Sequence, residues 1–135
     1  MARFKIRRGL RGFTLIELMI VISIMLILIA VSVPAYNRSI IHAREAVLKQ
    51  DLFQLRSLIS QYTLDKQKAP ESLDDLVSAG YLKQIPKDPF TGASDWTTEQ
   101  EDDTILDPSQ TETGIDDVHS ASSQTSSDGS AYSSW

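Results

Sequence analysis

One apolar run constrains this chain more than any other feature of its 135 residues. The run extends for 21 residues from Phe13 to Val33, and only four of its members are polar: Thr14, Glu17, Ser23 and Ser32. An α-helix rises about 1.5 Å per residue, so a run of this length is just long enough to cross a hydrocarbon core of about 30 Å. The sequence therefore predicts one membrane-spanning helix near the N-terminus.

Charge is distributed unevenly on the two sides of this run. Five basic residues and no acid precede it: Arg3, Lys5, Arg7, Arg8 and Arg11. From Asp88 to Trp135 there are eleven acids and no Lys or Arg. An excess of Lys and Arg marks the cytoplasmic side of a span, so we expect the N-terminus in the cytoplasm and everything after Pro34 outside it. The acidic half argues against nucleic acid as a partner, because phosphate binding needs clustered cations.

Glu17 is the unusual residue of the apolar run. A charged side chain at the centre of a spanning helix costs on the order of 2.5 to 3.5 kcal/mol, so it is usually retained for a partner. Two plainer interpretations stay open at this point. One is a membrane anchor whose Glu17 reaches the nearby interface. The other is a secretory signal peptide, in which Ala30 and Ser32 are the small residues before the cut.

The basic leader, Gly12, the letters FTLIEL and the apolar run follow one another in the order found in a known family. The N-terminus resembles those of type IV pilins and of the pseudopilins of type II secretion systems. The resemblance implies that a prepilin peptidase cuts between Gly12 and Phe13 and methylates the new N-terminus. It also implies a leader of residues 1–12, a transmembrane and filament-core helix of residues 13–34, and an amphipathic helix with a small head domain in residues 35–135.

The same resemblance gives Glu17 a partner. Cleavage creates an α-amino group on Phe13, which is protonated near neutral pH. In a filament, this amine of one subunit meets Glu17 of a neighbour, so that neither charge stays uncompensated in apolar surroundings. Glu17 is therefore predicted to be an assembly residue.

Helical periodicity resumes after Pro34, which we expect to break or kink the helix because proline lacks an amide hydrogen. An apolar stripe with a spacing of seven predicts an amphipathic helix, packed on its own head domain rather than in a dimeric coiled coil. We therefore expect the membrane helix and this stretch to form one long, bent helix to about Asp65. The stripe consists of Ile41, Leu48, Leu55 and Tyr62, with Leu52 and Ile59 between them. The polar residues expected on other faces are Arg38, Arg44, Glu45, Lys49, Gln50, Arg56 and Gln61.

A short helix is predicted next, because Ser72 and Asp75 form a capping-box pattern and Gly80 suits a helix end. The segment IPKDPFTG cannot continue a helix through Pro86 and Pro89, so it is predicted to be a rigid connection. This segment resembles one in the major pseudopilins of type II secretion, which favours that branch over true pili.

Three short strands are predicted after this connection: Asp95–Glu99, Gly114–His119 and a last one that ends with Tyr132 and Trp135. Asp128-Gly129 suits a hairpin turn. The fold class is therefore α+β, with a long N-terminal helix, half membrane-spanning and half amphipathic, packed on a small antiparallel sheet of about three strands. The serine-rich composition of the end alone suits disorder, but Trp135 favours an ordered end docked on the helix stripe.

Catalysis has little support in this sequence, and we expect no enzyme. The chain has no cysteine, which excludes thiol chemistry, and His42 is interpreted as a solvated residue. His119, close to Asp116 and Asp117, is a weak metal candidate.

The resembled pseudopilins carry calcium in their C-terminal loop, but this chain departs from them with the ending SSQTSSDGSAYSSW. No cofactor is expected except calcium, for which Asp116, Asp117 and Asp128 are candidates, with Asp102 and Asp103 as further ones. Contact with basic residues of the next subunit explains these acids equally well.

The resemblance predicts a bacterial inner-membrane protein with a single span, a cytoplasmic N-terminus and a periplasmic head. It polymerises with identical subunits into a pseudopilus that drives type II secretion. The implied partners are the prepilin peptidase, minor pseudopilins, an inner-membrane platform protein and an assembly ATPase. One alternative is a subunit of a type IV or competence pilus. An alternative of another class is a small secreted or membrane-anchored binding module, released after Ser32.

Overall fold

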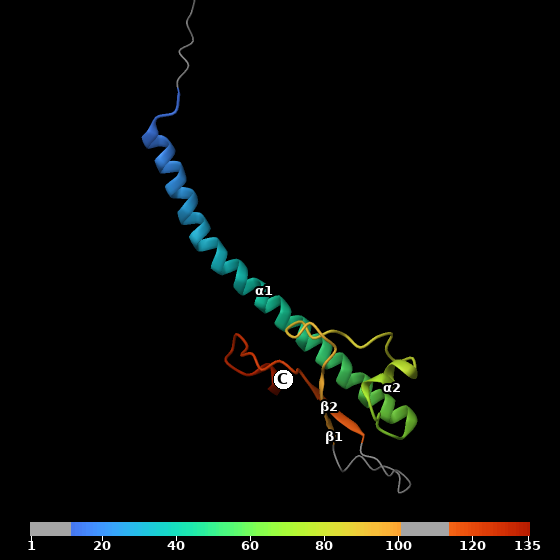
Figure 1. The fold of residues 1–135 in the computed structure, drawn as a ribbon. Coiled ribbons are helices and arrows are strands. Elements are labelled where there is room, and N and C mark those ends of the chain that lie inside the picture. The colour runs from blue at the N-terminus through green and yellow to red at the C-terminus, as the bar shows by residue number, and fades with distance from the viewer. Residues whose placement is uncertain (1–11, 101–113) are drawn as a thin grey trace, which may run out of the picture. The chain divides into compact units, whose positions relative to one another are not determined.

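A computed structural model describes residues 12–100 and 114–135 of the chain (Figure 1). Contacts divide the chain into two compact units, one that ends at Arg38 and one from Ser39 to Trp135. The elements are helix α1 (Leu15–Lys66), helix α2 (Leu73–Ser78), strand β1 (Thr97–Gln100), strand β2 (Ile115–His119) and a 3-10 turn (Tyr132–Ser134). The predicted α+β class with a long N-terminal helix is confirmed.

Pro34 lies inside α1, which is assigned as one helix on both sides of it. The expected single long helix through Pro34 is therefore confirmed, and Pro34 does not break it. Proline removes one backbone donor, and the helix continues because its other residues keep their own hydrogen bonds. The helix ends at Lys66, one residue beyond the predicted end, and Gln67 follows with a positive φ of 54°.

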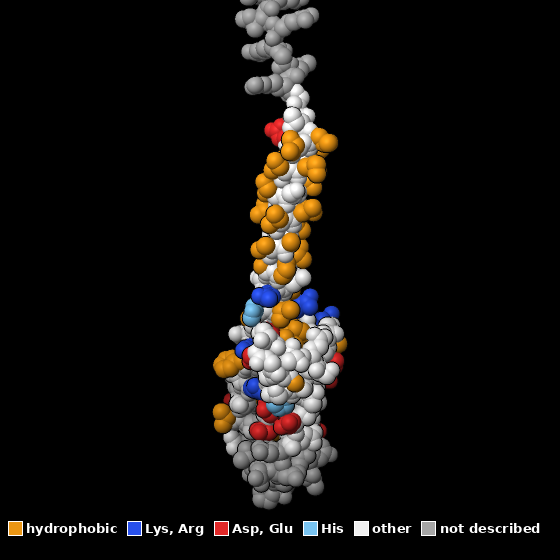
Figure 2. Space-filling model, turned by 90° about the vertical axis from the view of Figure 1, so that its left-hand side faces the viewer, with side chains coloured by type: hydrophobic (Ala, Val, Ile, Leu, Met, Phe, Trp, Pro, Cys, Tyr) orange, Lys and Arg blue, Asp and Glu red, His pale blue; other side chains and the backbone are white. Residues whose placement is uncertain are grey.

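The first unit has no buried side chain among residues 12–38. Leu15, Ile16 and Val31 are each at least 67% exposed, and the apolar residues between them are also exposed. Figure 2 shows these hydrophobic side chains along the surface of the N-terminal part of α1. By length and composition, α1 is the one helix of the described residues that is long and apolar enough to span a membrane.

The second unit has a core built around the predicted apolar stripe of α1. The buried members are Leu48, Leu52, Leu55 and Ile59 from α1, Leu73 and Leu76 from α2, and Trp96, Ile115, Val118 and Tyr132 from later segments. Burying a side chain of this size is worth about 1.5 to 3 kcal/mol, so the stripe supplies much of the free energy that holds α1 on the head. Ile41, the first member of the predicted stripe, is 42% exposed and lies outside this core.

Helix α2 and the connection after it follow their local sequence signals. Asp75 accepts a hydrogen bond from the backbone N of Ser72 at 3.0 Å, as in a capping box, and Gly80 has the positive φ of 85° that ends the helix. In the connection, Asp88 is fully buried and accepts hydrogen bonds from the backbone N of Phe90 at 2.7 Å and from the Ser120 hydroxyl. A buried carboxylate thus fixes the turn that begins at Asp88.

The sheet of the described residues has two strands, not three. β1 pairs with β2 antiparallel, with Thr97 opposite His119 and an irregularity between Glu99 and Gln100. The predicted turn at Asp128-Gly129 forms, and Thr125 and Ala131 make one isolated bridge across it. The third strand is wrong, because side chains bind the backbone N–H groups that a strand would offer to a neighbour. They bind those of Gln124, Ser127 and Ser130.

Candidate functional site

The predicted processing site lies just before α1. Gly12 and Phe13 have no regular secondary structure, and the Phe13 side chain is 81% exposed. A Cβ atom added to Gly12 meets no other atom within 4 Å. The fold of this chain therefore imposes no need for glycine at position 12, and any such need comes from a partner that binds the segment.

Thr14 caps the start of α1. Its side-chain Oγ1 accepts a hydrogen bond from the backbone N of Glu17 at 3.3 Å, and its carbonyl accepts one from the backbone N of Leu18 at 3.2 Å. Thr14 and Glu17 have the Thr-x-x-Glu spacing of a capping box, a sequence signal that our prediction did not use. Glu17 itself is exposed, in the first turn of a helix whose dipole favours a negative charge there.

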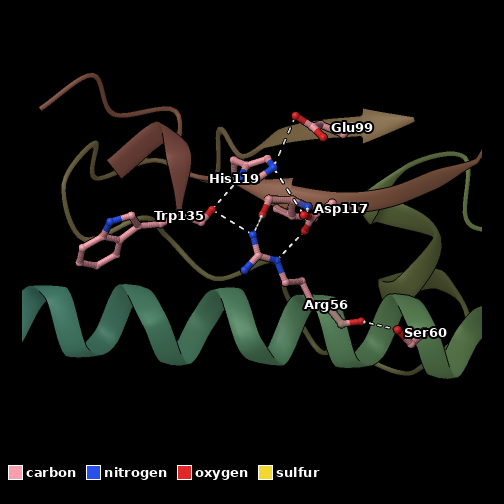
Figure 3. Close-up of polar contacts among 7 residues, drawn as sticks. Arg56, Ser60, Glu99, Asp117, His119 and Trp135 are labelled. Carbon is pink, nitrogen blue, oxygen red and sulfur yellow. Dashed lines mark hydrogen bonds and ion pairs between the residues drawn. The ribbon is translucent and has the colours of Figure 1, made fainter. Parts of the chain in front are cut away.

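In the head, Arg56 joins α1 to β2 and to the last residue (Figure 3). Its Nε donates to Asp117 Oδ1 at 2.5 Å, and its Nη2 donates to the main-chain oxygens of Val118 and Trp135, each at 3.0 Å. In Figure 3 the guanidinium group points from the helix toward the strand and the last residue, where its three acceptors lie. Arginine suits this position because its planar fork presents several donors at fixed angles.

His119 contacts the same main-chain oxygen of Trp135 from the other side. Its Nδ1 lies 2.6 Å from the oxygen of Trp135, and its Nε2 lies 3.5 Å from both Glu99 Oε1 and Asp117 Oδ2. Asp117 and His119 are two residues apart on β2 and share one face. His119 thus lies between Glu99, Asp117 and Trp135, and its Nδ1 is the ring atom that contacts Trp135.

Glu45 forms a second link between α1 and the C-terminal segment. The residue is 6% exposed, and its carboxylate accepts hydrogen bonds from Ser127 N and Oγ, both at 2.7 Å, and from Tyr132 Oη at 2.9 Å. His42 Nδ1 lies 3.4 Å away, on an exposed side chain. Burial acts to raise the pKa of Glu45, but the hydrogen bonds from Ser127 and Tyr132 and the nearby His42 leave it below its usual range. The prediction that Glu45 lies on another face of the helix than the stripe is wrong.

The calcium candidates do not meet in this structure. Asp117 is paired with Arg56, Asp116 is exposed, and Asp128 Oδ1 accepts hydrogen bonds from Ser126 and Ser130. Within residues 12–100 and 114–135, no three Asp, Glu, His or Cys side chains form a group suited to a metal ion. Asp102 and Asp103 lie outside the described residues. Calcium takes six to eight oxygen ligands, which this donor set does not assemble.

Trp135 is docked as the sequence predicts. Its ring packs against the core and lies edge-on to Tyr132, with 5.1 Å between ring centroids. Lys49 Nζ lies 4.4 Å from the centre of the Trp135 ring, a cation–π contact that also ties the residue to α1. The C-terminal segment is thus held to α1 at three points, Glu45, Lys49 and Arg56.

Comparisons with known proteins agree with the N-terminal motif and extend beyond it. Residues 7–33 match the family described as the prokaryotic N-terminal methylation motif. The type II secretion system core protein G of Klebsiella michiganensis is 31% identical over 102 residues, which cover 64% of this chain and 72% of that protein. Core proteins G of other bacteria match over a similar length.

Two relatives carry other names and match a smaller share of this chain. The type IV major fimbrial protein FimA of Dichelobacter nodosus is 41% identical over 61 residues, which cover 45% of this chain and 38% of FimA. The competence protein ComGC of Halalkalibacterium halodurans is 32% identical over 72 residues, which cover 53% of this chain and 71% of ComGC. No solved structure matches the chain. With its methylation motif and its long match to core protein G, the chain belongs to the family of the type II secretion system core protein G, the pseudopilins.

Proposed function

We propose that this chain is the structural subunit of a pseudopilus and that its N-terminal helix is both its membrane anchor and its filament core. The observation that carries the proposal is the exposure of the whole apolar run. A surface of this size is unstable in water and needs either lipid or the helices of other subunits around it. A subunit that moves from membrane to filament uses the same apolar surface in both places.

The proposed cycle begins with a precursor in the bacterial inner membrane, with a cytoplasmic N-terminus and a periplasmic head. A prepilin peptidase cuts between Gly12 and Phe13 and methylates Phe13. An assembly ATPase, a platform protein and minor pseudopilins then help identical subunits to polymerise, and the growing filament drives type II protein secretion. The role is mechanical and structural rather than enzymatic. The exposure of Gly12 and Phe13, which have no regular secondary structure, supports access by the peptidase.

The alternatives have less support. FimA and ComGC match shorter parts of this chain than core protein G does, so a role in a type IV or competence pilus is the weaker proposal. Release as a secreted binding module requires a cut after Ser32. That residue lies inside α1, where its hydroxyl donates to the carbonyl oxygen of Leu28 at 2.7 Å.

A pair of single substitutions separates the two processing schemes. Gly12→Glu is expected to leave an uncut precursor in the inner membrane, and Ser32→Leu is expected to be processed normally. Intact-mass analysis of the native protein gives the N-terminus, methylated Phe13 in the pseudopilin scheme and Val33 in the signal-peptide scheme. A mature wild-type chain that starts at Val33 overturns the proposal. So does a protein whose processing is blocked by Ser32→Leu and not by Gly12→Glu.

The role of Glu17 requires a second experiment. Glu17 carries a charge, and its backbone N also donates to the capping residue Thr14. Glu17→Ala removes the charge and the carboxyl group, whereas Glu17→Gln removes the charge and keeps a side chain suited to a capping box. If Glu17 pairs with the Phe13 amine of a neighbour, both variants are inserted and cut but form no filaments. An unpaired buried charge costs about 3 to 5 kcal/mol, enough to prevent assembly.

The measurement is the yield of sheared filaments, taken together with the mature mass. Ser23→Ala is the matched control, since it removes a polar group from the same run, one that bonds only the carbonyl oxygen of Met19 on its own helix. Normal filaments from a correctly processed Glu17→Gln protein contradict the charge pair and leave capping as the role of Glu17.

A further inference from the structure

The C-terminal segment of the head is ordered although it has few apolar residues. Between Ser120 and Trp135 the apolar side chains are Ala121, Ala131, Tyr132 and Trp135. Ser120, Ser122 and Ser126 are nevertheless at least nine-tenths buried. A polar loop of this composition does not bury enough apolar surface to stay ordered by itself. Specific polar contacts have to supply the remaining free energy that keeps the loop ordered.

Glu45 supplies the longest-range of these contacts. It lies on the buried stripe of α1, one helical turn before Leu48, and it reaches residues 82 and 87 positions away in the sequence. The three hydrogen bonds from Ser127 and Tyr132 satisfy both carboxylate oxygens. Since an isolated buried charge is strongly unfavourable, the position of Glu45 is stable only while the loop stays closed on it. The carboxylate and the loop therefore depend on each other.

Asp128 acts inside the loop in a similar way. Its Oδ1 accepts hydrogen bonds from the hydroxyls of Ser126 and Ser130 and from the backbone N of Ser130, across a turn where Gly129 has a φ of 91°. The hydroxyl donors are serines of the ending SSQTSSDGSAYSSW. In this chain two hydroxyl groups donate to Asp128 Oδ1, an oxygen that a calcium ion would need as a ligand.

We propose that Glu45 closes the C-terminal loop of this pseudopilin in place of a calcium ion, so that the head folds independently of calcium. Hydrogen bonds from serine and tyrosine donors to two carboxylates, Glu45 and Asp128, tie this polar loop to a fixed point. The fixed point is α1 itself, because Glu45 is part of it. The inference goes beyond the filament role and does not depend on whether the filament serves secretion.

The first test uses the full-length protein in detergent and needs no variant. Thermal unfolding of the head is followed by near-ultraviolet circular dichroism in EGTA and in millimolar calcium. The expected result is the same melting temperature in both. An ion that binds only the folded head with a micromolar dissociation constant would instead raise it by several degrees through mass action. A calcium-dependent rise overturns the proposal and leaves the filament role intact.

The second test removes the clamp. Glu45→Gln keeps the size of the side chain but loses the charge that three donors face, and Asp74→Asn removes an exposed carboxylate from α2 as a control. In EGTA, Glu45→Gln is expected to lower the melting temperature by roughly 5 °C or more and Asp74→Asn to leave it unchanged. Glu45→Gln is also expected to speed proteolytic cleavage between residues 120 and 131 at least several-fold.

Two milder variants cover the case in which Glu45→Gln does not fold. Ser127→Ala and Tyr132→Phe each remove one hydroxyl donor to Glu45 and leave the carboxylate in place. Each is expected to increase the cleavage rate of the loop, and neither to make the protein respond to calcium. Wild-type cleavage rates in both of these variants contradict the clamp.

Discussion

Arg56 offers the sharpest test of how the head is held together. Its guanidinium group makes the ion pair with Asp117 and the two hydrogen bonds to the main-chain oxygens of Val118 and Trp135. These contacts join the helix to the strand and to the end of the chain. Arg56→Ala removes all three at once, and one of the acceptors that lose this donor belongs to Val118, a fully buried residue.

The size of the effect follows from the exposure of the groups. The side chains of Arg56 and Asp117 are 38% and 37% exposed, so the ion pair is screened by water and contributes about 0 to 1 kcal/mol. Hydrogen bonds from a charged donor contribute about 1.5 to 3 kcal/mol each when buried, and we take about 1 kcal/mol for each of these partly exposed ones. The expected loss is about 2 to 3 kcal/mol, which lowers the melting temperature of a domain of this size by roughly 8 °C or more.

The assay is reversible unfolding of the full-length protein in detergent, followed by tryptophan fluorescence, to which Trp135 contributes. Arg56→Lys is expected to recover about half of the loss, because one ammonium group cannot replace a fork with three acceptors. Arg44→Ala, an exposed arginine on the same helix, is the control and is expected to change stability by less than about 0.5 kcal/mol. The reasoning fails if Arg56→Ala is as stable as the control, or if Arg56→Lys equals the wild type.

Three further predictions concern the head. Gly114→Ala places a Cβ atom 2.2 Å from Ala69 Cβ and is expected to cost about 1 to 3 kcal/mol in urea unfolding, with Ala69→Gly restoring part of the loss. Leu55→Ala is expected to cost about 2 to 5 kcal/mol, while Phe53→Ala, 70% exposed on the same helix, changes little. The lowered pKa of Glu45 adds stability above its unfolded pKa of about 4.3, so melting temperatures should fall as pH drops below that value, and less steeply in Glu45→Gln.

The parts of the fold that were predictable depend on local patterns. The apolar run and the stripe of α1 repeat at helical spacing, and the capping pattern of α2 lies within four residues. The processing motif is likewise continuous in the sequence. Each of these signals lies within one continuous stretch of the sequence, so it can be identified without knowing which distant residues are in contact.

The C-terminal half of the head was less predictable for a physical reason. The last segment looks like a strand because Tyr132 and Trp135 have high strand propensity, yet its backbone groups are bound by side chains of Glu45, Ser122 and Asp128. Glu45 and Arg56 each bind residues more than 60 positions away, and a single sequence has no periodicity that reports such pairs. A charged residue at a stripe position, as Glu45 is between Ile41 and Leu48, was the available signal.

The hydrogen bond of Thr14 to the first turn of α1 affects what processing does to the helix. The capping group belongs to the part of the chain that remains after the proposed cut, so the acceptors of the Glu17 and Leu18 backbone N–H groups stay in place when the leader is removed. Backbone donors without partners cost several kcal/mol each in lipid, and an end capped from upstream would have to re-form its contacts after cleavage. The proposed cut would thus replace the basic leader by a single amino group on Phe13 and leave both of these hydrogen bonds to Thr14 in place.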